Sequence, residues 1–101
     1  MEFKTEDFGG AKFTVPDKPT VFQLADYDSR RYDLRGLPSV VVLWEMAKAL
    51  ITDWESEAWP NLEADLHEDT ANPDHAVKVI EWAGVQVSAY RRSLDGISKN
   101  S

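Results

Sequence analysis

The sequence predicts an α+β domain in which an N-terminal β-hairpin is followed by a three-helix, mainly α part. Two patterns indicate this class: apolar and polar residues alternate around Gly9-Gly10, and three longer stretches repeat apolar residues at helical spacing. A chain of 101 residues fits one domain, and its 43% hydrophobic content is enough for a packed core. Within the single domain 1–101, we expect a hairpin over 1–16, helices over 20–35, 39–59 and 73–94, an acidic loop over 60–72 and a polar tail over 95–101.

The hairpin has two plausible registers. With a two-residue turn at Gly9-Gly10, charged side chains of the first strand face apolar side chains of the second. With a three-residue loop, Phe3 faces Val15 and Glu6 faces Lys12. We favour the second register, because it gives one apolar face and one face with a pair of opposite charges.

The first helix has a clear start and stop. Thr20 and Gln23 have the spacing of a capping box, so the helix should begin at Val21. Gly36 and Pro38 should end it near Arg35.

Two charged residues fall within the apolar half of this helix. Asp28 and Arg31 are spaced i,i+3, so they can pair with each other. We expect a half-buried ion pair there; the alternative is a polar contact with a partner.

The second helix carries the strongest periodic signal in the chain, and Pro60 should end it. Its apolar residues fall within an arc of about 160° on a helical wheel. These residues are Val40, Leu43, Trp44, Met46, Ala47, Leu50, Ile51, Trp54 and Ala58. Trp44 and Trp54 lie near the centre of the arc and should be core. Trp59 lies outside it, so it either caps the core or serves as an anchor for a partner.

The third helix should begin with Asn72 as N-cap and Pro73 as its first residue, and should end before Gly96. Its core stripe comprises Ala76, Val79, Ile80, Ala83, Val87, Tyr90 and Leu94. Trp82 and Ala89 lie at the edge of the stripe, and Val77 and Val85 lie off it. Gly84, in mid-helix, either permits close packing or leaves room for a partner.

Charge is distributed unevenly along the chain, whose formal net charge is −7. Residues 49–77 contain no Lys or Arg and carry the carboxylates of Asp53, Glu55, Glu57, Glu63, Asp65, Glu68, Asp69 and Asp74. This acidic stretch is either a solvated loop region or a docking surface for a basic partner. Binding to nucleic acid is disfavoured, because it requires clustered Lys and Arg.

The sequence contains no recognisable catalytic or metal-binding motif, so we expect neither enzymatic activity nor a cofactor. Cysteine is absent, and Gly9-Gly10 is not part of a phosphate-binding loop. His67 stands among carboxylates, but an EF-hand loop starting at Asp65 would need Gly and Glu where Thr70 and Ala76 stand. No apolar run reaches the about 20 residues that span a bilayer, and no signal peptide is visible, so we expect a cytoplasmic protein without a membrane segment.

The order of the motifs resembles that of a known family. The helices containing "KPTVFQLADYDS", "LWEMAKALITDWESEAWP" and "VIEWAGVQVSAY" are followed by the ending "LDGISKNS". From about Phe13 to Ser101, the chain resembles the small tail assembly chaperones of long-tailed bacteriophages, which are encoded just before the tape measure protein.

The resemblance implies a protein that works by contact. Such chaperones bind the tape measure protein, keep its long apolar helices soluble and help to recruit tail tube subunits. The expected location is the cytoplasm of the bacterial host, with the chaperone absent from the mature virion. Many are also made as a longer product by ribosomal frameshifting. Self-association through a hairpin edge or the outer face of the third helix would be compatible with this role.

The sequence is also compatible with two other functions. The chain could be a small acidic inhibitor that imitates nucleic acid and acts on a host or defence protein, or a structural component of the virion. A chaperone should bind mainly through apolar side chains and tolerate moderate salt, whereas a mimic should weaken steeply as salt rises. The candidate partner-binding residues are Trp59, Trp82, Val85, Ala89, Glu63, Asp65, Glu68 and Asp69.

Overall fold

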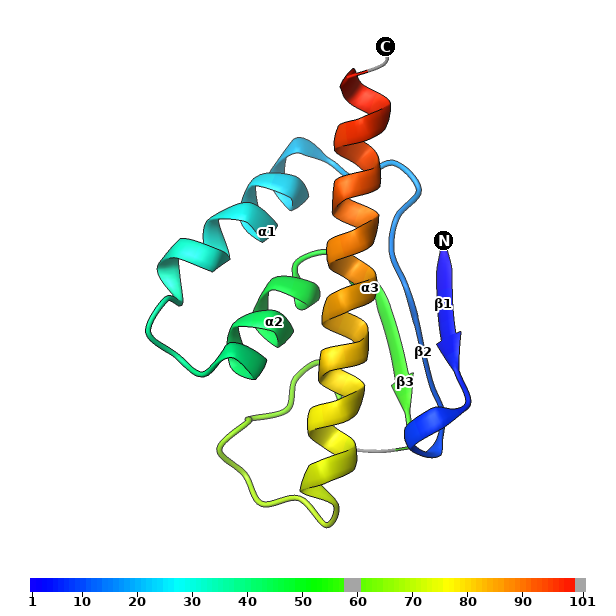
Figure 1. Cartoon of the computed structure of the whole chain (residues 1–101), viewed down its shortest axis with the longest axis vertical. Coiled ribbons are helices and arrows are strands. Elements are labelled where there is room, and N and C mark those ends of the chain that lie inside the picture. The colour runs from blue at the N-terminus through cyan, green and yellow to red at the C-terminus, as the bar shows by residue number, and fades with distance from the viewer. Residues whose placement is uncertain (58–60, 100–101) are drawn as a thin grey trace.

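The computed structural model describes residues 1–57 and 61–99, and within them it contains a three-stranded antiparallel sheet and three α-helices. The strands are β1 (Glu2–Thr5), β2 (Ala11–Thr14) and β3 (Asp53–Ser56), and the helices are α1 (Val21–Asp33), α2 (Ser39–Lys48) and α3 (Pro73–Lys99). Helix α3 runs the length of the molecule, with the sheet on one side and α1 and α2 on the other (Figure 1). The predicted α+β class is confirmed.

The sheet has a third strand that the sequence pattern did not reveal. We expected one helix over 39–59, but α2 ends at Lys48 and β3 pairs with β2. The backbone N–H of Thr52 donates to the Thr14 carbonyl oxygen at 2.9 Å, which brings the chain onto the edge of the hairpin. Trp54 then lies directly opposite Phe13, and their rings stack at 5.9 Å between centroids. Cross-strand pairing and aromatic stacking therefore replace the last turns of the expected helix.

The hairpin has neither of the registers we considered. Phe3 pairs with Phe13 rather than Val15, and Lys4 pairs with Lys12. The connection is longer than three residues because it includes a 3₁₀ turn, η1 (Asp7–Gly9). The favoured register is thus shifted by two residues, which keeps the same side chains on the apolar face. Lys12 forms its ion pair with Glu55 of β3, at 3.3 Å, instead of with Glu6.

The predicted helix starts are confirmed, whereas the predicted ends differ. The Thr20 side chain accepts a hydrogen bond from the Gln23 backbone N–H, and the Gln23 side chain accepts one from Thr20. The Asn72 side chain accepts a hydrogen bond from the His75 backbone N–H at 3.3 Å, so Asn72 caps α3 as expected. Helix α3 continues through Gly96 to Lys99 instead of ending near Leu94.

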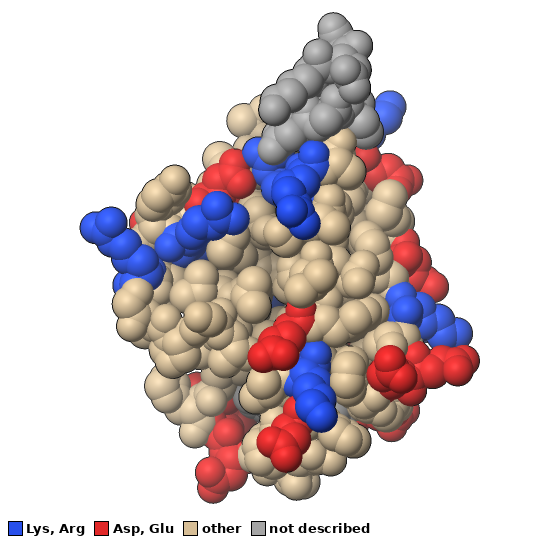
Figure 2. Space-filling model, viewed as in Figure 1, with Lys and Arg blue, Asp and Glu red and all other residues tan. Residues whose placement is uncertain are grey.

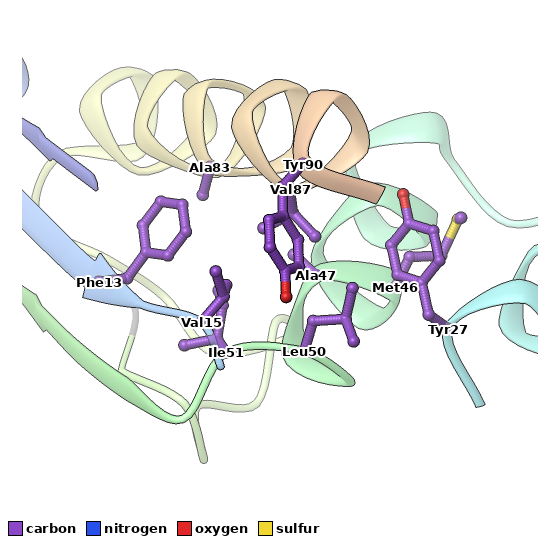
Figure 3. Close-up of a cluster of buried hydrophobic side chains, with 10 residues drawn as sticks. All are labelled: Phe13, Val15, Tyr27, Met46, Ala47, Leu50, Ile51, Ala83, Val87 and Tyr90. Carbon is purple, nitrogen blue, oxygen red and sulfur yellow. The ribbon is translucent and has the colours of Figure 1, made fainter. Parts of the chain in front are cut away.

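The core lies where α3 crosses the sheet and the end of α2. Its fully buried side chains come from all three parts, and Figure 3 shows Phe13 beneath Ala83 of α3, with Met46 beside Tyr27 at the other end of the cluster. The Tyr90 hydroxyl donates to the Pro16 carbonyl oxygen, which ties α3 to the segment after β2. Burial, reinforced by the nearby Asp17 carboxylate, raises the pKa of Tyr90 above its usual value.

Ion pairs connect the helices in a way that differs from the expected Asp28–Arg31 pair. Asp28 is paired with Arg91 of α3, at 2.9 Å, and Arg31 is exposed. Arg30, one residue earlier, pairs with Asp26 at 2.9 Å and also donates to the Glu45 carbonyl oxygen of α2. Asp28 and Arg30 therefore connect α1 to α3 and to α2. Contacts between helices compete with ion pairs along one helix, and here the contact of Asp28 with Arg91 replaces the expected pair with Arg31.

Gly84 permits α2 and α3 to approach closely. A Cβ at this position would lie 3.1 Å from the Leu43 Cβ, which side-chain rotation cannot move away. We expect Gly84→Ala to lower the free energy of unfolding by about 1 kcal/mol, because overpacking outweighs the gain in helix propensity. Gly84→Val should lower it further, by about 2–3 kcal/mol. Urea unfolding of the two variants checks this; an alanine variant more stable than the wild type would contradict the packing role.

Candidate docking groove

An apolar groove with an acidic rim lies between α2, the loop that precedes α3, and the first turns of α3. Its volume is about 400 Å³, within the range of about 300–1,000 Å³ that is usual for ligand pockets. The floor and sides are formed mainly by aliphatic side chains from three segments. The lining residues are Val40, Val41, Leu66, Glu68, Asp69, Thr70, Pro73, Ala76, Val77 and Ile80. We call this site the acidic groove.

The loop that forms one wall is held by its own polar side chains. Asn61 accepts a hydrogen bond from the Glu63 backbone N–H, and Asp65 accepts one from the His67 backbone N–H, each at 2.9 Å. The Glu68 backbone N–H donates to the Asp65 carbonyl oxygen at 3.0 Å. These short turns are typical of Asn and Asp in loops. They position Leu66 on the groove and leave the neighbouring carboxylates in solvent.

Among the described residues, the charged side chains that line the groove are all acidic. Glu68 and Asp69 are exposed at its rim, and no Lys or Arg is found among the described residues that line it. In Figure 2, acidic side chains predominate around the lower end of the molecule, near the loop before α3, whereas Lys and Arg gather over α1 and the upper part of α3. A basic segment approaching the groove would therefore meet a favourable field, which mainly raises the rate of association.

Part of the apolar surface of the groove is exposed to solvent. Val77 is 40% exposed on the first turns of α3, and Val41 and Leu66 are half-buried beside the groove. Covering them would remove apolar area from water, at about 25 cal/mol per Å². The arrangement can therefore bind an amphipathic segment, with aliphatic side chains on the floor and cations at the rim.

The residues predicted from sequence as partner-binding do not form one surface. Glu68 and Asp69 border the acidic groove, and Glu63 and Asp65 are exposed elsewhere on the same loop. Val85, 58% exposed, and Ala89, also exposed, lie further along α3, outside the lining of the groove.

The tryptophans have separate positions. Trp82 is half-buried, with its ring edge on Phe13 at 5.3 Å, so it faces the sheet rather than the groove. Trp44 is fully buried, as predicted, and packs edge to face on Trp54 at 5.0 Å. The prediction for Trp59 lies outside the described residues.

Sequence reasoning missed the apolar half of the groove. Val40 was assigned to the core of the second helix, and Val77 was noted only as lying off the core stripe of the third. Leu66 is an isolated aliphatic residue in an acidic loop. An aliphatic residue off the stripe, together with one inside a polar loop, is a weak signal that becomes informative only when the fold brings the two together.

In the part of the chain that the structure describes, no three His, Asp or Glu side chains are grouped so that they could hold a metal ion. No helix among these residues is long and apolar enough to cross a membrane. Comparisons with protein-family models, with curated proteins and with solved structures found no match to this chain.

Proposed function

We propose that this chain is a non-enzymatic tail assembly chaperone of a long-tailed bacteriophage, acting in the cytoplasm of the bacterial host. It binds the tape measure protein, keeps its apolar helices soluble and helps to recruit tail tube subunits. The motif order from about Phe13 to Ser101 supports the family, and the acidic groove supports the mode of binding. The segment held in the groove is an amphipathic helix of the tape measure protein, with aliphatic side chains on one face and Lys or Arg beside them.

The observation that carries this proposal is the combination of an aliphatic floor with a rim of carboxylates. A chaperone for long apolar helices must cover aliphatic side chains while it remains soluble itself. The groove offers aliphatic contacts from Val41, Leu66 and Val77, and the net charge of −7 opposes self-aggregation. A nucleic-acid mimic would need the carboxylates alone, and the apolar floor would have no purpose in it.

Val77→Lys tests the groove directly. A lysine at this position would extend over the floor and pair with the rim carboxylates, so it would both fill the groove and neutralise it. We expect binding of the tape measure protein to weaken by at least about tenfold, a loss typical of a central interface contact. The measurement is co-purification of the tagged chain with co-expressed tape measure protein.

Val85→Lys is the matched control, because it makes the same substitution on the same helix at a more exposed position outside the groove. It should leave co-purification close to that of the wild type. Equal losses in the two variants would show that binding uses the outer face of α3 instead of the groove. Thermal unfolding followed by circular dichroism should show both variants folded, since both valines are exposed.

A further inference from the structure

A second groove, of opposite charge, lies between the three helices at the other end of α3. One hollow of about 260 Å³ is lined by Tyr27, Asp28, Arg31, Ser88, Arg91 and Arg92. A neighbouring hollow of about 370 Å³ shares Tyr27, Arg31 and Ser88 with it. The shared residues make the two hollows one continuous surface, which we call the arginine groove.

The arginine groove is positive although the whole chain is strongly negative. It is lined by Arg31, Arg35, Arg91 and Arg92, and among the residues whose side chains the structure describes, Asp28 is the one acidic residue in its lining. Asp28 is bound by Arg91 through two contacts, at 2.9 and 3.2 Å. Arg31, Arg35 and Arg92 are exposed, and none of them forms an ion pair with a residue of 1–57 or 61–94. A guanidinium group that is exposed and has no ion-pair partner is suited to binding a carboxylate through two parallel hydrogen bonds.

The floor of the groove is apolar and includes the hydroxyl group of Tyr27. Val42, Leu43 and Met46 of α2 line it, and Leu37, which is 49% exposed, stands at its rim. Tyr27 lines both hollows and is only 4% exposed. Its hydroxyl forms no hydrogen bond to a residue of 1–57 or 61–94, and it is not wholly shielded from solvent, so a group bound in the groove can reach it.

We infer that the arginine groove is a second docking site, and that it takes a segment of a partner protein in which acidic and apolar side chains alternate along one face. Carboxylates of this segment bind Arg31 and Arg92, aliphatic side chains cover Leu37 and Met46, and an acceptor group meets the Tyr27 hydroxyl. The inference does not depend on the identity of the protein bound in the acidic groove. It makes the chain an adaptor that can hold a basic and an acidic segment at the same time.

Charge and chemistry distinguish this occupant from a nucleic acid. A phosphate backbone has no aliphatic side chains to cover the floor, so it would use only the arginines. An acidic amphipathic segment would use both the arginines and the floor, and its own charges would keep it away from the acidic groove.

Three synthetic helical peptides test the inference by fluorescence anisotropy at moderate salt. The first places Glu and Leu on one face, the second replaces each Glu by Lys, and the third replaces each Leu of the first by Gln. We expect the Glu–Leu peptide to bind, and the double variant Arg31→Gln, Arg92→Gln to bind it about tenfold more weakly. The double variant Lys4→Gln, Lys12→Gln removes the same charge from the sheet and should bind as the wild type does.

The same peptides distinguish binding in the acidic groove from binding in the arginine groove. Val77→Lys should weaken binding of the Lys–Leu peptide and leave that of the Glu–Leu peptide unchanged. The inference is wrong if the Arg31/Arg92 variant binds the Glu–Leu peptide like the wild type, or if the Leu-to-Gln peptide binds equally well, which would indicate charge attraction alone. Competition of the Glu–Leu peptide by single-stranded DNA of equal charge would likewise overturn it.

Discussion

Phe13→Ala is expected to lower the free energy of unfolding by about 3–5 kcal/mol, the range for removing a buried aromatic ring. Phe13 is 1% exposed and contacts three other rings: Phe3 at 5.0 Å, Trp54 at 5.9 Å and Trp82 at 5.3 Å between centroids. Its loss would leave a cavity where β1, β3 and α3 meet. Because domains of this size are stable by only about 5–15 kcal/mol, the variant should be close to unfolding.

Urea unfolding followed by tryptophan fluorescence checks this prediction. Phe13→Leu keeps most of the buried volume and should lose about 1–2 kcal/mol, which gives a measurable value even if the alanine variant does not fold. Phe22→Ala removes the same ring from a site that is 77% exposed, and it should change stability by no more than about 0.5 kcal/mol. Similar losses at Phe13 and Phe22 would contradict the position of Phe13 at the centre of the core.

Trp44 should show a large difference between two substitutions. The residue is fully buried, and its indole N–H has no hydrogen-bond partner among the residues that the structure describes. Trp44→Ala is expected to lower the free energy of unfolding by about 3–5 kcal/mol through lost packing. Trp44→Phe loses less volume and also removes the unsatisfied donor, whose burial is unfavourable by about 1–3 kcal/mol. The two effects nearly cancel, so Trp44→Phe should change stability by less than about 1 kcal/mol.

The same urea unfolding series measures both Trp44 variants. A loss in Trp44→Phe as large as that in Trp44→Ala would mean that the indole N–H is satisfied in solution. The edge-to-face contact with Trp54 should remain in Trp44→Phe, because a phenyl ring can keep this geometry.

The fold was predictable wherever local chemistry determines it. The capping box at Thr20 and the Asn72-Pro73 start of α3 were recognisable because their partners lie within three residues. The end of α2 was not, because apolar residues at positions 50, 51 and 54 satisfy a helical period as well as a turn followed by a strand. A pairing between β2 and β3, 38 residues or more apart, decides between the two possibilities.

The ion pairs also depend on contacts between residues that lie far apart in the sequence. Asp28 and Arg31 had the spacing of a helical pair, but Asp28 binds Arg91, 63 residues away. Likewise, Lys12 binds Glu55 rather than a residue of its own hairpin. Spacing along one element identifies which charges can meet locally, and tertiary packing selects among those contacts and more distant ones.

The acidic groove was predictable only in part. The carboxylates at its rim follow from the run without Lys or Arg, since charge is visible in the sequence. The apolar floor combines side chains from α2, the loop and α3, and no one segment shows it. For this reason the sequence pointed to Val85 and Ala89, which are exposed on α3, and passed over Val41 and Leu66.

The most direct test of the central claim is the solubility of the tape measure protein encoded in the same genome, expressed with and without this chain. Sedimentation of cell extracts followed by affinity purification gives both the soluble fraction and the complex. We expect the tape measure protein to be largely insoluble alone, and to be soluble and co-purify at moderate salt when this chain is present. Equal solubility in both cases, with no co-purification, would contradict the claim that this protein is a tail assembly chaperone.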